Sequence, residues 1–308
     1  MPLALTPRYA PGRHIHPRGT ASSLYSQKRL PLYKAQISLD AMPTAHGHGA
    51  RTGYEPILQA LLPLYPAWAL KERKFGVGYE QVGHYAHGWY MRCHRGAEAI
   101  LILDEAGFAN EGAPIRRSII EHVVALKWLA VEGNKVADTI ARGHAFDTER
   151  RKNALDAARW TSVNLDGFAN IIKEIDPDNR ESSNDYLLNF ARRCAEFSDV
   201  HTMPGYLAEC GQTHPGYESA MSYVNVPAGT IRPTPREQIW QVPFCTTHVL
   251  EALMAVREVF DPRPWERELD ELGRQYQFVT NEARREDGLR PVDWSTGQLI
   301  DEPAIPPT

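Results

Sequence analysis

The stretch Ala113-Pro-Ile-Arg-Arg-Ser-Ile-Ile-Glu-His-Val-Val-Ala-Leu-Lys-Trp-Leu-Ala130 is the most informative segment of the chain. Its apolar residues cover most of a helical circumference, which predicts a largely buried helix over residues 113–131. Its first turns also carry Arg117, Glu121 and His122. Long charged side chains are seldom buried without partners. We therefore expect this helix to hold the functional site, with Arg117 and Glu121 largely buried and paired.

Helical spacing of apolar residues continues on both sides of this segment, and runs of alternating β-branched residues are nearly absent. The pattern predicts an all-α protein with a single helical-bundle domain over residues 53–285. Besides 113–131, the expected helices span residues 79–108, 135–160, 165–175, 184–197, 217–224, 236–260 and 265–284.

Both ends of the chain differ from this central part. Residues 1–52 form a leader that contains repeated Pro, Gly and His and has little periodicity, and residues 286–308 form a similar tail. Such composition favours extended or disordered ends.

Composition narrows the functional classes. The chain has 308 residues, with 34 Lys and Arg against 38 Asp and Glu, and contains no block of like charge that would form a nucleic-acid arm. Its four cysteines are widely spaced without a C-x-x-C pair, which favours free thiols in a reducing compartment. No apolar run is long enough for a membrane span, and the amino terminus lacks an apolar secretory core. We expect a cytoplasmic protein without a membrane segment.

Arg117 and Glu121 are four residues apart and share one helix face. They can form an internal ion pair that fixes the position of the helix, or they can belong to a polar cluster that opens into a cleft. The sequence leaves both interpretations open.

The spacing Arg117-x4-His122, or Arg116-x5-His122, also resembles the Arg-x4–6-His motif of the HEPN helical ribonucleases. There, arginine would stabilise phosphate charge and histidine would serve as general acid or base. Ser118, directly after the arginine, fits that motif, whereas its place in an early core helix departs from it. A metal-independent ribonuclease, as a toxin or phage-defence effector, is the alternative function.

A second polar segment runs from His201 to Tyr217 and includes Tyr206 and His214. Its Pro-Gly pairs predict a partly irregular stretch rather than one long helix, and irregular segments on a rigid frame often carry function. Pro215 favours an extended backbone at His214. A histidine that only caps a helix or satisfies the core is the other interpretation.

These segments together resemble the bacterial DUF5677 family. The matching features are Arg-Ser-Ile-Ile-Glu at residues 117–121 followed by an apolar run ending in Trp-Leu, a preceding turn at residues 107–112, and a downstream Tyr…Ser/Cys…His-Pro pattern. Tyr206, Cys210, His214 and Pro215 supply that pattern, with Cys210 where members usually have a small hydroxyl residue. The resemblance covers roughly residues 80–260. It implies an all-helical fold and a shared Arg117, Glu121, Tyr206 and His214 site, without implying a reaction.

Other motifs predict little chemistry. His84, His87 and His94 have helical spacing but lack enough ligands for a zinc site, and His248 with Glu251 is expected to be a surface pair. The chain has no Gly-rich phosphate loop, no G-x-S-x-G and no H-E-x-x-H. No metal and no cofactor is predicted.

Two functional hypotheses follow, and whether the protein is an enzyme stays open. The favoured one is a non-catalytic binding or regulatory module that holds a small polar ligand or a protein partner at Arg117, Glu121, Tyr206 and His214. The alternative is the ribonuclease with Arg117 and His122 as catalytic residues and RNA as partner. A homodimer is left open in either case.

Overall fold

The computed structural model describes residues 48–69, 74–160, 165–175, 185–225, 230–231, 241–286, 288–293 and 298–300. All of them belong to the compact unit Pro43–Thr308. The described α-helices are α1 (His48–Leu61), α2 (Leu64–Ala69), α3 (Gly83–Glu105), α4 (Ala113–Glu132), α5 (Ala137–Ala157), α6 (Leu165–Ile175), α7 (Phe190–Phe197), α8 (Thr202–Thr213), α9 (Tyr217–Met221), α10 (Gln241–Arg257) and α11 (Glu266–Glu286).

Extended structure among these residues consists of three antiparallel pairs of two-residue strands. β1 (Lys74–Phe75) pairs with β4 (Phe260–Asp261), β2 (Val224–Asn225) with β3 (Thr230–Ile231), and β5 (Val292–Asp293) with β6 (Gln298–Leu299). Pairs this short join neighbouring loops and do not form a layer. The prediction of an all-α fold is therefore confirmed.

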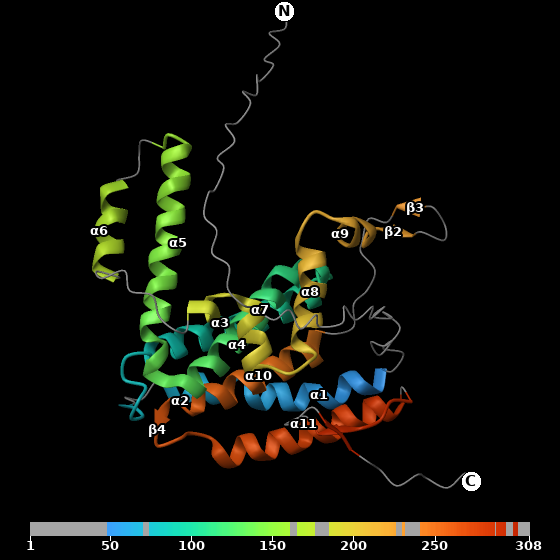
Figure 1. Ribbon diagram of the computed structural model, residues 1–308. Coiled ribbons are helices and arrows are strands. Elements are labelled where there is room, and N and C mark those ends of the chain that lie inside the picture. The colour runs from blue at the N-terminus through green and yellow to red at the C-terminus, as the bar shows by residue number, and fades with distance from the viewer. Residues whose placement is uncertain are drawn as a thin grey trace, which may run out of the picture. The chain divides into compact units, whose positions relative to one another are not determined.

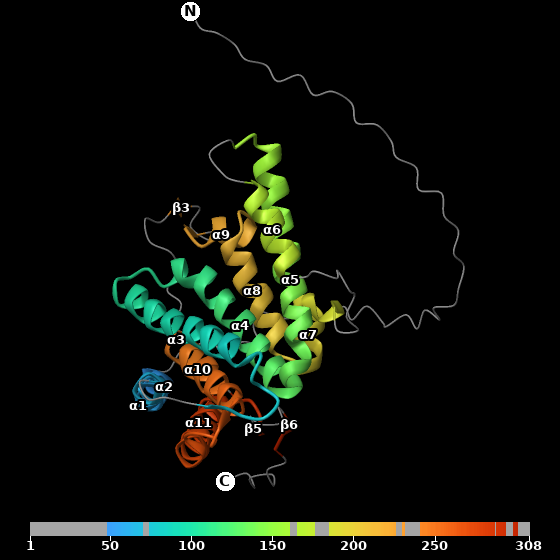
Figure 2. The ribbon, with the colours of Figure 1, turned by 90° about the vertical axis from the view of Figure 1, so that its left-hand side faces the viewer.

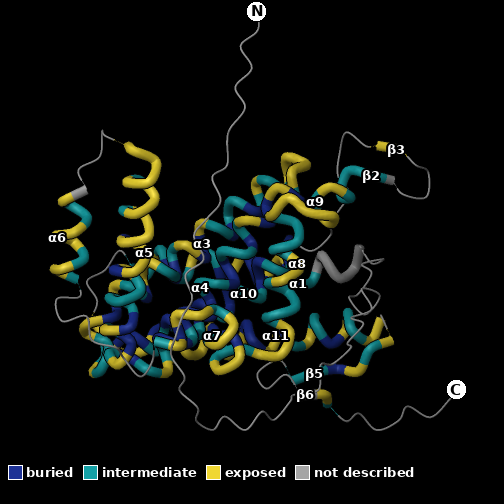
Figure 3. The backbone as a smooth tube through the Cα atoms, turned by 45° about the horizontal axis from the view of Figure 1, so that its top comes forward, coloured by how far each residue is buried: buried dark blue, intermediate teal, exposed yellow. Residues whose placement is uncertain are grey.

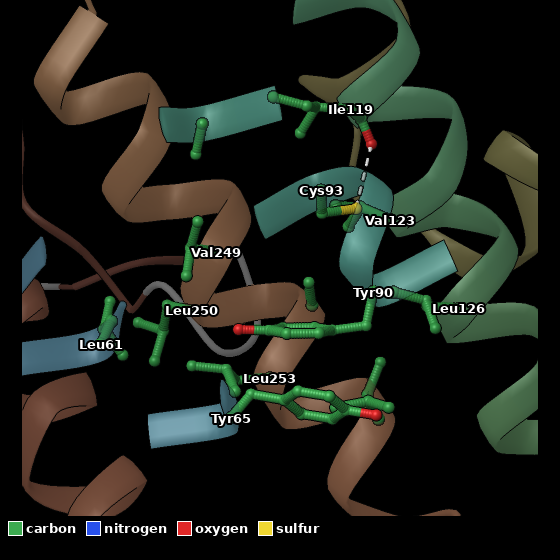
Figure 4. Packing of buried hydrophobic residues seen from close by; sticks show 14 of the residues in the cluster. Leu61, Tyr65, Tyr90, Cys93, Ile119, Val123, Leu126, Val249, Leu250 and Leu253 are labelled. Atoms are coloured by element: carbon green, nitrogen blue, oxygen red, sulfur yellow. Dashed lines mark hydrogen bonds between the residues drawn. The ribbon is translucent and has the colours of Figure 1, made fainter. Parts of the chain in front are cut away.

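The core lies where α3, α4 and α10 pack against one another, with α1 packed on α10 and α11 on α1 (Figures 1 and 2). Figure 4 shows side chains from several of these helices meeting in that core. The rings of Tyr65 and Tyr90 lie 4.1 Å apart between centroids, and Leu250 and Leu253 of α10 are fully buried. Burying a large apolar side chain contributes about 1.5–3 kcal/mol, so this cluster is the main source of stability.

Helix α4 is central because apolar residues occupy most of its surface. Trp128 is 1% exposed, although it lies in the last two turns. The helix ends at Gly133, which has φ of 56°. A Cβ at Gly133 would lie 2.5 Å from the carbonyl oxygen of Gly78, so glycine is required at this end. On its other sides α4 packs against α7 and α8, which brings those helices to its polar residues.

Helices α5 and α6 pack against each other, and the outer part of α5 extends beyond the remaining helices (Figure 2). In Figure 3 this outer part is mostly exposed, whereas α4 and α10 are mostly buried or intermediate. None of the described helices combines the length and the apolar character that crossing a lipid bilayer requires.

Several predicted helix boundaries agree closely with the structure, including residues 165–175 for α6. The segment from His201 to Tyr217 is not one long helix, as predicted, since residues 214–216 form a bend between α8 and α9, but the expected irregularity was wrong for residues 202–213, which form the continuous helix α8. Pro204 lies in the first turn of α8, where a backbone N–H has no helical partner, so proline is tolerated there. The sequence pattern also missed α1 and α2. The predicted boundaries of the leader, the domain and the tail stay predictions, since residues 1–47 and 301–308 lie outside the described residues.

Candidate ligand site between α4 and α8

Helices α4 and α8 pack side by side in opposite directions. Glu121 of α4 contacts Tyr206 near the start of α8, whereas Arg117, one turn earlier in α4, contacts His214 just after the end of α8. Residues 85 and 97 positions apart in the sequence therefore form one polar row along this interface.

Arg117 is at the centre of that row. Its Nε donates to Oε1 of Glu121 over 3.2 Å, and its Nη1 lies 2.8 Å from Nε2 of His214. The guanidinium carbon lies 5.2 Å from the ring centroid of Tyr206. Three partners on two helices thus hold the guanidinium in one orientation.

Tyr206 joins the two helices through its hydroxyl, which donates to Oε1 of Glu121 over 3.0 Å. Burial, the Glu121 carboxylate and the Cys210 thiol together raise the pKa of Tyr206 to about 12. Phe190 of α7 packs on the Tyr206 ring, with centroids 4.2 Å apart. Tyr206 therefore stays protonated and acts as a hydrogen-bond donor at neutral pH.

The site is more open than the sequence predicted. The side chains of Arg117 and Glu121 are paired as expected, yet they are 27% and 35% exposed instead of largely buried. The helix face that carries them is covered by the short helices α7 and α8 and not by the central core. A solvent-borne molecule can consequently reach both side chains.

His214 is held at the bend between α8 and α9. Its backbone is extended (φ −97°, ψ 148°), as the following Pro215 predicts, and its carbonyl accepts a hydrogen bond of 2.8 Å from the Ser219 hydroxyl. Because a guanidinium can only donate, Nε2 of His214 is the acceptor in the contact with Arg117. His214 is therefore neutral in this arrangement and carries its proton on Nδ1.

The deeply buried charge on α4 is Arg116, which the sequence pattern indicated only as an alternative spacing for the ribonuclease motif. It is 2% exposed and donates to Oε1 of Glu209, to the Ala109 carbonyl and to Oε1 of Gln241, over 2.9, 2.8 and 3.0 Å. The other Glu209 oxygen, Oε2, is buried and has no hydrogen-bond partner in the part of the chain that the structure describes.

Helical spacing could have identified Arg116. It precedes Ile119, Ile120 and Val123 by three, four and seven residues, so it lies on the same buried face as these apolar residues. Arg117 lies about 100° further round the helix, at the edge of that face. The pair Arg116–Glu209 thus anchors α8 to α4, and Arg117 is presented beside it.

His122 does not belong to this row. Its Nδ1 lies 2.6 Å from the carbonyl oxygen of Ser118, one turn earlier in α4. Within the described residues, the side-chain hydrogen bonds of Arg117 go to Glu121 and His214 and not to His122. Burial lowers the pKa of His122 despite the Ser118 carbonyl, and the charges of Arg92 and Arg193 lower it further.

The three histidines of α3 have structural partners. Nδ1 of His87 lies 2.6 Å from the Tyr65 hydroxyl, and Nε2 of His94 lies 2.9 Å from the Leu62 carbonyl oxygen. His84 packs against the ring of Tyr85. No group of three or more metal-ligating side chains occurs among the described residues.

The prediction of a surface pair at His248 and Glu251 was wrong. Their side chains are only 16% and 13% exposed, and Glu251 also accepts a 2.7 Å hydrogen bond from Nζ of Lys127 on α4. Burial by itself raises the pKa of Glu251, but Lys127 and His248 more than offset it and lower the pKa to about 2. This triad joins α4 to α10.

The comparison with protein families matches residues 83–230, from α3 to β3, to DUF5677, a family of unknown function. This segment is similar to DUF5677. The resemblance predicted from the sequence is therefore confirmed over a shorter range than residues 80–260. The DUF5677 segment contains Arg117, Glu121, Tyr206 and His214. Helix α10, which carries Gln241, His248 and Glu251, lies beyond it. Comparisons with curated proteins and with solved structures find no match.

Proposed function

We propose that the protein is a non-catalytic binding module whose α4–α8 site holds a small polar ligand. The observation that supports this most is that the Arg117 side chain is both held in one orientation and exposed to solvent. Its guanidinium is oriented by Glu121, Tyr206 and His214, yet over a quarter of the side chain is exposed. A preoriented and accessible guanidinium can bind a ligand without first losing side-chain freedom.

The hydrogen-bonding groups favour a ligand that both accepts and donates. Arg117 has three further N–H groups beyond the two that bind Glu121 and His214, and His214 has its Nδ1–H. Oε2 of Glu121 accepts no hydrogen bond within the described residues. Arg117 and Glu121 balance each other's charge. A small zwitterion or a primary amide, such as a free amino acid, matches this combination.

Titration of the protein with free amino acids and small amides, followed by calorimetry, tests the proposal. Saturable binding is expected for the wild type and should be lost in Arg117→Met. Arg95→Met is the matched control, because Arg95 is an exposed arginine on α3 with its own carboxylate partner, Glu98. The proposal fails if no compound of these classes binds, or if Arg117→Met binds as tightly as the wild type.

The ribonuclease alternative is not favoured by these contacts, since Arg117 is engaged with Glu121 and His214 and not with His122. We expect purified protein to leave RNA intact in the presence of a chelator. Cleavage that disappears in a folded His122→Ala variant would instead support the alternative. A cytoplasmic location, a protein ligand and a homodimer stay predictions from the sequence.

A further inference from the structure

The contact between Arg117 and His214 raises the question of what holds His214 in place. His214 is exposed, and Nη1 of Arg117 lies 2.8 Å from its Nε2. A hydrogen bond that is open to solvent competes with water and contributes little by itself. His214 also lies beyond Thr213, the last residue of α8, so the helix alone does not fix the direction of its side chain. The remaining restraint comes from the segment that follows.

That segment, residues 214–223, contains α9, and we call it the α9 segment. It packs on the end of α8 (Figure 1). The Ser222 hydroxyl donates to Oε1 of Gln212 on α8 over 2.8 Å, and the Tyr223 hydroxyl donates to Oε1 of Glu111. Glu111 lies in the short 3-10 helix directly before α4. The α9 segment is therefore attached both to the end of α8 and to the residues that lead into α4.

Ser219 is the residue of the α9 segment that contacts His214. Its Oγ lies 2.8 Å from the carbonyl oxygen of His214, 3.0 Å from the nitrogen of Gly216 and 3.1 Å from the carbonyl oxygen of Gly216. A hydroxyl has one hydrogen to donate and accepts with its lone pairs. Ser219 therefore donates to the nearer carbonyl, that of His214, and accepts from the Gly216 N–H. One side chain thus closes the bend of residues 214–216.

The backbone of His214 is consequently held on both sides. Its N–H donates to the Cys210 carbonyl over 3.1 Å, and its carbonyl accepts from Ser219. Pro215 adds a third restraint because it disfavours the helical conformation at the preceding residue. With both peptide groups fixed, the Cα–Cβ bond of His214 has one direction. The imidazole then reaches Arg117 by side-chain rotation alone, among a few staggered rotamers.

We propose that Ser219 is a positioning residue of the α4–α8 site. By fixing the His214 carbonyl it keeps Nε2 of the imidazole on Arg117 and leaves Nδ1–H for a ligand, a role in binding that rests on the proposed function. The hydrogen bonds of Ser219 within the described residues go to His214 and Gly216 and not to Arg117. Ser219 therefore acts on the site through His214. An imidazole that is already oriented loses less side-chain freedom when a ligand binds.

NMR of the histidine side-chain nitrogens tests the positioning without any ligand. At about pH 8.5, where most imidazoles are neutral, His214 of the wild type should carry its hydrogen on Nδ1, and His214→Asn identifies its signals. Ser219→Ala should shift these signals toward those of a solvent-exposed histidine that exchanges between tautomers. Ser219→Thr keeps the hydroxyl and should retain the wild-type signals.

Ser222→Ala is the matched control. It removes a hydrogen bond of the same length between the α9 segment and α8 but no contact with His214, so the His214 signals should stay unchanged. Circular dichroism checks that each variant keeps the helical fold. The proposal is overturned if Ser219→Ala leaves the His214 signals as in the wild type, or if Ser222→Ala shifts them equally.

Calorimetric titration with free amino acids and small amides tests the consequence for binding. Ser219→Ala should weaken binding by about two- to tenfold, the effect of one hydrogen bond, and should have no further effect in a His214→Asn background. A loss that persists in that background would overturn the proposal, because Ser219 would then act independently of His214. A wild type that binds none of these compounds would end the proposed function, whereas a shift of the His214 signals in Ser219→Ala would still support the positioning of His214.

Discussion

Replacing Glu251 by glutamine should both destabilise the protein at neutral pH and flatten the dependence of its stability on pH. Glu251 is 13% exposed and accepts hydrogen bonds from Lys127 and His248. Glutamine keeps the size of the side chain but removes the negative charge. Lys127 would then be left partly buried without its counterion.

The magnitude follows from the pKa of Glu251, which falls from 4.5 to about 2 on folding. At about 1.4 kcal/mol per pKa unit, this difference corresponds to about 3 kcal/mol of stability. Because the folded pKa is the lower one, the contribution is fully present above the unfolded value of 4.5 and is lost as the pH falls toward 2. By pH 3 about 2 kcal/mol of it should be gone.

Urea denaturation followed by circular dichroism at pH 7 and pH 3 measures both effects. At pH 7 the Glu251→Gln variant should be about 3 kcal/mol less stable than the wild type, and at pH 3 the difference should shrink to about 1 kcal/mol. Glu271→Gln is the matched control, because Glu271 is 54% exposed in its pair with Arg274. Surface pairs contribute about 0–1 kcal/mol, so this control should stay close to the wild type.

The reasoning is refuted if Glu251→Gln and the wild type lose equal stability between pH 7 and pH 3. It is also refuted if Glu251→Gln is no less stable than Glu271→Gln at pH 7, since the triad would then contribute no more than an exposed pair.

Two further predictions concern α4 and α8. Arg116→Met should lower the free energy of unfolding, measured by urea denaturation, by about 3–5 kcal/mol, because it leaves the Glu209 carboxylate buried without its cation. Arg117→Met should lower it by less than about 1 kcal/mol, and equal losses in the two variants would contradict the assignment of Arg116 as the anchor. Glu121→Gln should lower the pKa of Tyr206 from about 12 toward 10, measured by NMR of labelled tyrosine, because the neighbouring carboxylate raises it; an unchanged pKa would leave burial and the Cys210 thiol as the causes.

The fold class could be predicted from local patterns. Apolar residues at helical spacing define α4 and α6, and Gly133 ends α4 where its positive φ and the nearby Gly78 carbonyl require glycine. Residue 204 shows where such patterns fail. Proline was taken as a helix breaker, but its position within the first turn of α8 makes it compatible with the helix.

The composition of the α4–α8 site was also predicted, because the polar residues of α4 and the Tyr206 to Pro215 segment stand out from their apolar surroundings. The exposure of Arg117 and Glu121 was not predicted, since both were expected to be largely buried. Helical spacing could have placed Arg116, and not Arg117, on the buried face of α4, but the partners that Arg116 meets there are set by where α8 and α10 pack.

The sequence by itself therefore determined that this protein is helical, where several of its helices begin and end, and which side chains carry the polar chemistry of α4, since these depend on contacts within a few turns. Only the tertiary structure decided which of these charges are paired. Glu209, Gln241 and His214 approach α4 from about 90 to 130 positions away in the sequence. The pairing of charges depends on distances between helices, and no periodicity along the chain contains that information.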